Sequence, residues 1–282
     1  EMYTGDAEKL VIPEGIEYID DLWMYGTPEN VRALILPESL KELPADISWG
    51  MGTSLEVVYM GNRITAPRRN DFAGCFALKH IHLSENLTYI SDAMFDSTVS
   101  LASVHIPATV KKIGASAFNR SLVRRVTIPA SVEIIGANAF SWPCDNPYVF
   151  TSSSLNNALT MEQAGKFYPY VQKKLYDENG YIPREITVLN HNVEYTGPAY
   201  YVDDTGAWGS ITVRAKADSV TQQECDNIAK LGYAITFASL DMTASEVALY
   251  ALQAADNVLI SNESTADSVL GDIKSNYLTS LE

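Results

Sequence analysis

Cysteine is scarce in this chain of 282 residues, and the three cysteines that occur are far apart. Cys75, Cys144 and Cys225 form no CxxC pair and are odd in number, so the sequence predicts neither a disulfide framework nor a cysteine metal site. This scarcity does not argue against secretion, because a stack of repeats with a continuous core needs no covalent cross-links.

Long hydrophobic runs and an excess of basic residues are missing too. No apolar stretch approaches the roughly 20 residues that a membrane helix requires. The chain has 20 basic and 35 acidic residues, a net charge of −15, which disfavours nucleic-acid binding because phosphate contacts need clustered lysine and arginine. No basic and apolar leader precedes Glu1, so we expect a mature or trimmed fragment whose targeting signal has been removed.

The signatures of common enzyme classes are absent as well. The sequence contains no GxGxxG, no P-loop, no HExxH and no GxSxG. A glycosidase needs two carboxylates that can lie far apart in sequence, so a surface hydrolase stays open as a third alternative without a motif to support it. We therefore predict a protein that is not an enzyme and that needs no cofactor or metal ion.

The chain does contain an internal repeat with a period in the low twenties. Each row, as we call one repeat, has a short strand of alternating apolar residues, and the clearest rows continue with Pro, an Ile-Gly step and an Ala-Phe pair. The last apolar residues of the strands are separated by 24, 24, 23, 23 and 22 positions: Ile12, Leu36, Met60, Leu83, Ile106 and Ile128. Phe150, 22 positions further on, fits a seventh row. Such a period indicates a solenoid, in which stacked rows bury a core that no single row could bury.

The chemistry within one row predicts its local structure. The strand directs two side chains inward and one outward, and the proline after it lacks an N–H group and ends the strand. Gly114 and Gly136 follow isoleucine, which indicates either a positive φ or a close approach of two backbones. Equivalent buried positions are expected in successive rows for Phe118 and Phe140, and for Val110 and Val132.

The consensus LxxVxIPxxVxxIGxxAFxxC resembles the bacterial BspA-like leucine-rich repeat, and the rows that begin at Leu101 and Leu122 match it best. The resemblance covers about residues 8–150 and implies a right-handed leucine-rich-repeat solenoid with short parallel strands. It also implies that Cys75, three residues after Phe72, is a buried packing residue. In that family the repeats are associated with adhesion and with binding of host or partner-cell proteins, and they carry no catalytic residues. A secreted or cell-surface protein follows from the resemblance.

The segment after the clear repeats, 151–240, contains three strand signals. They are Ile186–Val188, Ile211–Val213 and Ile235–Phe237, spaced by 25 and 24 positions. Capping boxes at 160–163 and 221–224 predict helices, and the second helix should end at Gly232. Alternating strands and helices at this spacing predict either α/β rows that continue the solenoid or a small separate α/β unit, and we favour continuation.

The sequence thus divides into a leucine-rich-repeat solenoid at 1–150, a helix cap with an α/β segment at 151–240, and an acidic helical tail at 241–282. Capping boxes at 243–246 and 264–267 predict a pair of tail helices. Residues 255–273 resemble a short helical module of surface proteins from gut Firmicutes. The predicted fold class of the whole chain is α/β.

The surface of the predicted sheet is the first candidate binding site. The residue between the two inward side chains of a strand, and the residue just before them, should face outward. In successive rows these positions hold Lys9 and Val11, Ala33 and Ile35, Val57 and Tyr59, His80 and His82, Ser103 and His105, and Arg125 and Thr127. An exposed apolar patch beside titratable imidazoles predicts a protein-binding surface around Tyr59, His80, His82, His105 and Arg125, with an affinity that depends on pH. The alternative is an ordinary solvated surface, and without an identified carboxylate or thiol nearby we predict no metal site.

Aromatic residues after the repeats form the second candidate site. Tyr195, Tyr200, Tyr201 and Trp208 are close together in sequence, and exposed aromatic rings can stack on sugars. They would suit a carbohydrate- or cell-wall-binding module, whereas the alternative is a segment that uses tyrosine as half-buried core. We favour a protein-binding module over this glycan-binding one.

Overall fold

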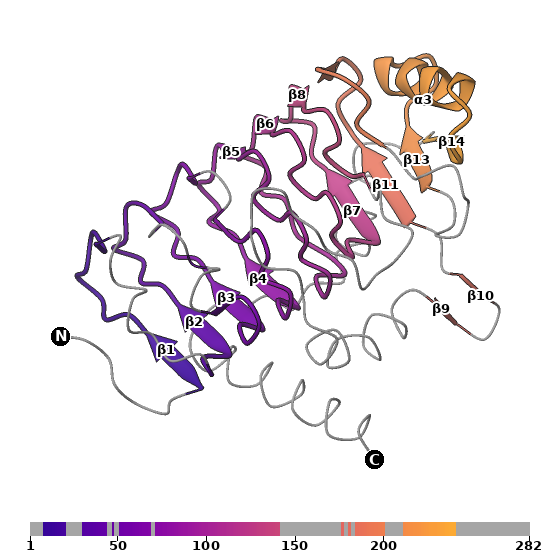
Figure 1. Cartoon of the computed structure of the whole chain (residues 1–282). Helices are drawn as coiled ribbons and strands as arrows, with labels where there is room; N and C mark the ends of the chain where they lie inside the picture. The colour runs from indigo at the N-terminus through magenta and orange to yellow at the C-terminus, as the bar shows by residue number, and fades with distance from the viewer. Residues whose placement is uncertain are drawn as a thin grey trace.

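The computed structural model describes residues 8–20, 30–43, 47, 51–68, 71–141, 176–177, 180–181, 184–200 and 211–240. The predicted tail helices and most of the helix predicted from 160 lie outside these residues, as do Cys144, Phe150, Tyr201 and Trp208. The expectation that this helix runs towards Gly180 is wrong, because Tyr176–Asp177 is a strand. Within the described residues the rows stack along one axis, from indigo at the N-terminal end to yellow near residue 240 (Figure 1). No helix among the described residues is long and apolar enough to cross a membrane.

One side of the stack is built from parallel strands that successive rows contribute. The first four strands, β1 (Lys9–Val11), β2 (Ala33–Ile35), β3 (Val57–Tyr59) and β4 (His80–His82), form a parallel sheet in sequence order. A second four-stranded parallel sheet contains β7 (Arg125–Ile128), β11 (Arg184–Val188), β13 (Ile211–Ala215) and β14 (Ile235–Ser239). The row between β4 and β7 pairs with β7 through a single bridge, from Ser103 to Arg125. We call this succession of strands the main strand face.

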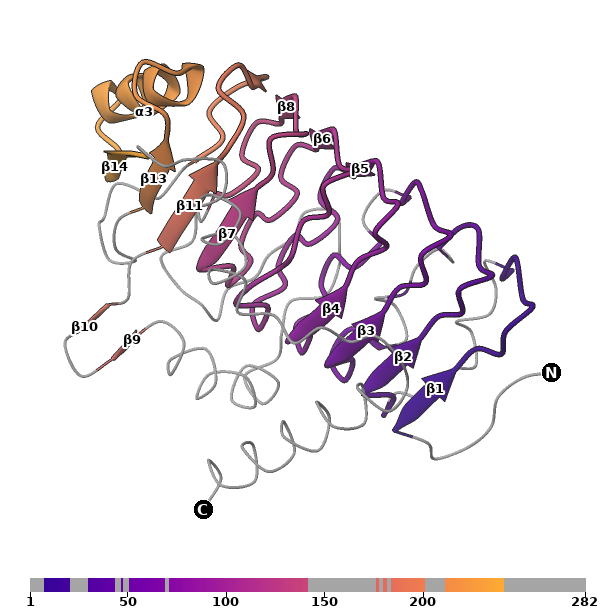
Figure 2. The same ribbon diagram turned by 180° about the vertical axis from the view of Figure 1, so that it is seen from behind.

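A second line of very short strands runs along the other side of the rows (Figures 1 and 2). It consists of β5 (Tyr89–Ile90), β6 (Lys112–Ile113), β8 (Ile134–Ile135) and β12 (Glu194–Tyr195), again parallel. Outside the rows, β9 (Tyr176–Asp177) and β10 (Gly180–Tyr181) form a two-stranded antiparallel hairpin. The described part of the chain is therefore a parallel-strand solenoid with little helix, as the repeat predicts.

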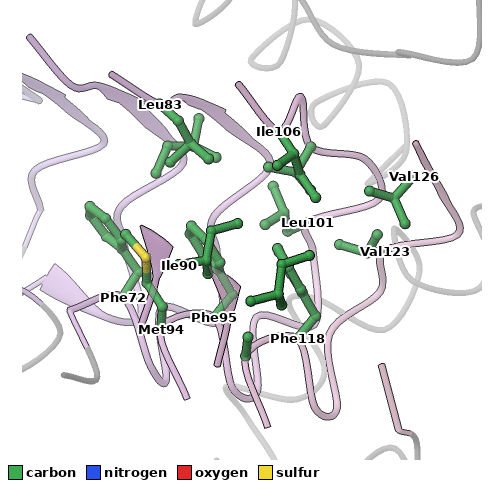
Figure 3. Close-up of a cluster of buried hydrophobic side chains, with 14 of the residues drawn as sticks. Phe72, Leu83, Ile90, Met94, Phe95, Leu101, Ile106, Phe118, Val123 and Val126 are labelled. Atoms are coloured by element: carbon green, nitrogen blue, oxygen red, sulfur yellow. The ribbon is translucent and has the colours of Figure 1, made fainter. Parts of the chain in front are cut away.

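An aromatic stack runs through the core between the two strand lines. Phe72, Phe95, Phe118 and Phe140 stack in order, with ring centroids 5.7, 5.1 and 5.2 Å apart, and all four are fully buried. Apolar side chains of both strand lines surround the rings (Figure 3). The predicted equivalence of Phe118 with Phe140 is confirmed, and Val110 and Val132 are both fully buried.

The seventh row differs from the prediction. Phe150 was expected to continue the strand series after Ile128, but Val188 of β11 pairs with Ile128 instead. The offset from the sixth row stays at 60 positions, because Tyr195 pairs with Ile135. The Phe140 backbone N–H likewise donates to the Ala199 carbonyl, as the Phe118 N–H donates to that of Ala139, so Ala199 is the equivalent of Ala139. Residues 142–183 are thus an insertion between two consecutive rows, and a search at a constant period passes over it.

The segment beyond this row continues the solenoid, since β13 and β14 extend the sheet that contains β7 and β11. Between them lies the helix α3 (Val220–Lys230). The capping box predicted at Thr221 is wrong by two positions: the N-cap is Ser219, whose hydroxyl accepts the Gln222 backbone N–H, and Thr221 is buried inside the helix. Gly232, with φ of 94°, follows the C-cap as predicted.

The glycines of the Ile-Gly step are explained by close backbone approach and not by a positive φ. A Cβ atom on Gly136 would lie 2.3 Å from the Ala115 nitrogen, and one on Gly114 would lie 2.5 Å from the Asp92 nitrogen. Positive φ occurs two residues later, at Ser116 (55°) and Asn138 (58°). The glycine therefore allows adjacent rows to touch, and the turn itself is made by residues with side chains.

Candidate functional site

The strand register places the candidate residues of the main strand face in two columns. Val57 pairs with His80 and Tyr59 pairs with His82, so the two histidines of β4 continue the columns of β3. The Ser103–Arg125 bridge extends the first column to β7. The structure thus places these residues of successive rows side by side, as the repeat predicts.

The apolar side chains predicted on this surface are buried in β2 and β3, whereas Val11 of β1 is 37% exposed. Ala33 and Val57 are 0% exposed, Ile35 is 7% exposed and Tyr59 is 6% exposed. Adjacent strands are only about 4.8 Å apart, so the small Ala33 is shielded between Lys9 and Val57, and the Tyr59 ring is covered by the stacked His82 ring. The expectation of an exposed apolar patch across β2 and β3 is therefore wrong. Exposure alternates along β1, β4 and β7 but not along β2 and β3.

Tyr59 and His82 form the best-defined contact of the site. Their rings stack with a centroid distance of 4.9 Å and an interplanar angle of 7°. The Tyr59 hydroxyl donates a hydrogen bond to the carboxylate of Glu38. Burial raises the pKa of Tyr59, and the Glu38 carboxylate raises it further, so the phenol stays protonated and the ring stays in place.

The imidazoles of His82 and His105 differ in their surroundings. Burial lowers the pKa of His82, and the charge of His105 lowers it further, whereas the carboxylates of Glu85 and Glu38 act in the opposite direction. His105 is exposed, and its Nε2 lies 4.0 Å from a Glu85 oxygen. One imidazole therefore favours its neutral form, while the other lies within ion-pair distance of a carboxylate.

Toward the later rows the main strand face becomes charged. Arg125 is half-buried, and its cross-strand neighbour is Glu185 of β11. Glu185 in turn accepts a hydrogen bond from Nε of Arg214 on β13 at 2.9 Å. The sequence analysis did not predict that Glu185 follows Arg125 in the same column, because residues 142–183 separate the two rows in the sequence.

The aromatic residues proposed for sugar stacking belong to the core where they are described. Tyr200 is 1% exposed and continues the aromatic stack, 6.0 Å from Phe140. Its hydroxyl lies 2.9 Å from that of Tyr195, which lies 2.9 Å from the Thr221 hydroxyl on α3. A buried ring cannot stack on a sugar, so the exposure expected for Tyr200 is wrong and the interpretation as core is the better one.

The buried cysteines have a packing role. Cys75 and Cys225 are free and buried, and burial raises the pKa of each thiol to about 12. Among the described residues, no group of three or more histidine, cysteine or acidic side chains is arranged to hold a metal ion. The role that the resemblance implies for Cys75 thus agrees with its surroundings.

The repeats also identify the family. The model of the BspA type leucine rich repeat region matches in six copies, over residues 2–122 and 29–147. The two matches overlap and together cover just over half of the 282 residues. The chain belongs to the BspA-type leucine-rich-repeat family.

Solved structures with similarity to this BspA-type protein come from several bacteria. The pneumococcal vaccine antigen PcpA is 13% identical with a TM-score of 0.38, over 76% of this chain and 42% of the antigen. A leucine-rich repeat protein from Bacteroides ovatus is 13% identical with a TM-score of 0.37, over 73% of this chain and 59% of that protein. A leucine rich cell surface protein from Faecalibacterium prausnitzii is 15% identical with a TM-score of 0.37, over 90% of this chain and 91% of that protein. The chain thus spans less than two thirds of the first two proteins. No curated protein is significantly similar to it.

A ladder of ion pairs borders the main strand face of this BspA-type protein, just before the first strands. Arg32 lies 3.7 Å from Glu8 and 2.7 Å from Glu56, and Glu56 also lies 3.1 Å from Lys79. These four residues alternate in sign at spacings of 24, 24 and 23. Because Lys79 and Glu56 are largely buried, a slip of one row would leave charges unpaired, so the ladder specifies the register. The periodic alternation of charge was the available signal in the sequence.

Proposed function

We propose that this chain is a non-catalytic interaction module that binds a protein partner on the main strand face around Tyr59, His82 and His105. The observation that carries the proposal is the Tyr59–His82 stack, which lies beside the exposed His105 and Glu85. The half-exposed His82 ring is already held in place against the buried Tyr59, so it loses little conformational freedom on binding, which favours it as an interface contact. The half-exposed His82 edge and the His105 imidazole are the groups that a partner would contact.

Membership in a repeat family that occurs in surface proteins supports an extracellular or cell-surface location. The partner would then be a protein on a host cell or a neighbouring cell. Histidine changes its charge between about pH 5 and 8, so partner affinity would change over that range.

The experiment places a photo-crosslinking residue at position 85, which is exposed beside His105, and, as a control, at position 133, which is exposed near the second strand line. A protein captured only from position 85 is then purified, and its affinity is measured at pH 5.5 and 7.5. We expect the double variant His82→Ala, His105→Ala to bind at least tenfold more weakly, whereas Lys112→Ala on β6 binds normally. Equal binding by the double variant and the wild type contradicts the proposal.

The absence of catalysis has its own test. The purified chain should show no turnover on glycoside, ester or peptide libraries, because the repeat family supplies no catalytic groups. An activity that disappears on substitution of one carboxylate would overturn this part of the proposal.

A further inference from the structure

A groove of about 670 Å³ is lined by residues of three connections, 62–65, 86–88 and 108–111, the last two of which lead from the main strand face to β5 and β6. Its lining comes from three successive rows, and its two cations are Arg63 in the first of these rows and Lys111 in the third. The Thr88 backbone N–H donates to the Thr65 carbonyl at 2.9 Å, and the Lys111 N–H donates to the Thr88 carbonyl at 2.7 Å. The lining residues therefore repeat at the row spacing, which makes the groove a periodic surface.

The side-chain hydrogen-bond donors on the floor of the groove are bonded to backbone carbonyls of the protein itself. The Thr88 hydroxyl donates to the Thr65 carbonyl at 2.8 Å, and the Thr109 hydroxyl lies 2.8 Å from the carbonyl oxygens of Glu85 and Leu87. The Asn86 amide donates to the Asn62 carbonyl at 2.7 Å. Since these hydroxyl and amide donors are already bonded to backbone carbonyls, the side-chain oxygens of Thr88, Thr109 and Asn86 are left to act as acceptors. Such a surface suits a ligand that carries many hydroxyl donors and C–H groups.

The cations are held by exposed ion pairs that a ligand can replace. Nη1 of Arg63 lies 3.1 Å from Glu17, and Nζ of Lys111 lies 3.5 Å from Glu133. All four side chains are more than 40% exposed, and exposed pairs of this kind contribute little to stability. No carboxylate lines the groove itself, so its lining is basic on a chain with a net charge of −15.

We propose that this groove binds a linear acidic glycan built from uronic acid units. Its hydroxyl groups would donate to the threonine and asparagine oxygens of the floor, and its carboxylates would replace Glu17 and Glu133 at Arg63 and Lys111. Three rows cover about 10 Å along the stacking axis, so the groove holds a short oligosaccharide segment. This site is separate from the proposed protein-binding surface and from the buried tyrosines once considered for sugar stacking.

Isothermal titration calorimetry with pentagalacturonate as the probe tests the proposal, with its fully methyl-esterified form as the uncharged control. We expect the acid to bind with a Kd below about 1 mM, to weaken with added salt, and to bind at least tenfold more tightly than the ester. The double variant Arg63→Gln, Lys111→Gln should lose at least tenfold in affinity. The control Arg214→Gln, which removes a half-exposed ion-paired cation away from the groove, should not.

We expect Glu133→Gln to bind the acid more tightly than the wild type does, because it removes the carboxylate that competes with the ligand for Lys111. No heat from the acid at about 1 mM, equal binding of acid and ester, or unchanged affinity in the double variant would each overturn the proposal. Circular dichroism melts confirm that the variants are folded, and their binding to the captured protein partner separates this site from the main strand face.

Discussion

The ring of Tyr200 stacks on that of Phe140 at a centroid distance of 6.0 Å, although sixty positions separate the two residues. Every earlier step of the stack joins residues 22 or 23 positions apart. Tyr200 carries a hydroxyl where the others carry none, and that hydroxyl pairs with Tyr195. The last ring of the stack thus connects the repeat core to the polar contacts of α3.

The aromatic stack makes a direct stability prediction. Phe118→Ala removes the ring between Phe95 and Phe140, and we expect a loss of ~3–5 kcal/mol in the free energy of unfolding, as for other large-to-small changes in a core. Denaturant melts measure this, with Lys112→Ala as a surface control. A loss below about 1 kcal/mol would mean that the stack contributes little.

Two substitutions of Tyr200 distinguish the stability contribution of its ring from that of its hydroxyl. Tyr200→Ala should cost ~3–5 kcal/mol because it truncates the stack. Tyr200→Phe keeps the ring and removes one buried hydrogen bond, so it should cost only about 1 kcal/mol, since the Tyr195 hydroxyl retains Thr221. The same denaturant melts apply, and equal losses in both variants would show that the hydroxyl and not the ring holds the row.

The sequence predicted the stack well where the period is constant and failed where it is interrupted. Phe118 and Phe140 follow from a fixed spacing, because stacked rows of equal length repeat the same environment. Phe150 was chosen for the next strand by extending that spacing, but the chain inserts residues 142–183 before it resumes with β11. The signal was present, since Ala199-Tyr200 resembles Ala139-Phe140, but it depends on tolerating a tyrosine and a long gap.

For the candidate site, the columns were predictable and their exposure was not. Alternation along a strand gives the direction of a side chain, so the pairing of Tyr59 with His82 followed from the repeat. Solvent exposure depends on every neighbour in three dimensions, and Ala33 and Val57 are buried in spite of their position. The groove at Arg63 and Lys111 was missed because turn residues had no role in the repeat consensus.

Substitutions of Gly136 and of Ser116, the positive-φ residue in the preceding row, should change the stability of the protein in opposite directions. Gly136→Ala places a Cβ atom against the backbone of Ala115, and we expect a loss of ~1–3 kcal/mol, as for other overpacked sites. Ser116→Gly should be neutral or stabilising by up to about 1 kcal/mol, because glycine adopts the φ of 55° without strain. Thermal melts of the two variants measure both effects, and a neutral Gly136→Ala would show that the rows can move apart.

Asp71 occupies a position that other rows fill with apolar side chains. Phe72 donates its backbone N–H to the Met94 carbonyl, and Phe95 donates its N–H to the Ala117 carbonyl. Asp71, which precedes Phe72, is therefore in the same column as Met94 and Ala117. Asp71 is 2% exposed, and neither carboxylate oxygen has a hydrogen-bond partner among the described residues. Burial raises the pKa of Asp71 to about 7, whereas the nearby backbone N–H of Arg68 and then the charge of Arg68 act in the opposite direction.

A raised pKa in the folded state gives this group a defined pH dependence. Between about pH 4 and 7 the folded chain keeps a proton that the unfolded chain loses, so the stability contribution present below pH 4 is lost as pH rises through 7. A three-unit shift corresponds to about 4 kcal/mol. Asp71→Ala should therefore stabilise the protein more at pH 8 than at pH 5 in urea melts, with Asp71→Asn as a second variant that cannot titrate. A pH-independent difference between Asp71→Ala and the wild type contradicts the assignment.

His82 should give a dependence of the opposite sign. Its pKa is lowered by burial in the folded state, so the unfolded chain takes up a proton first as pH falls below the ordinary histidine range. Stability from His82 is therefore present above about pH 6.5 and is lost as pH falls toward the lower folded pKa. His82→Phe keeps a ring against Tyr59 and cannot be protonated, so its stability relative to the wild type should increase between pH 7 and pH 5. Urea melts at both pH values measure the difference, and His191→Phe serves as a control on an exposed histidine. If the difference between His82→Phe and the wild type does not change with pH, burial does not govern the charge of His82, and the pH dependence proposed for partner binding would have to come from His105 alone.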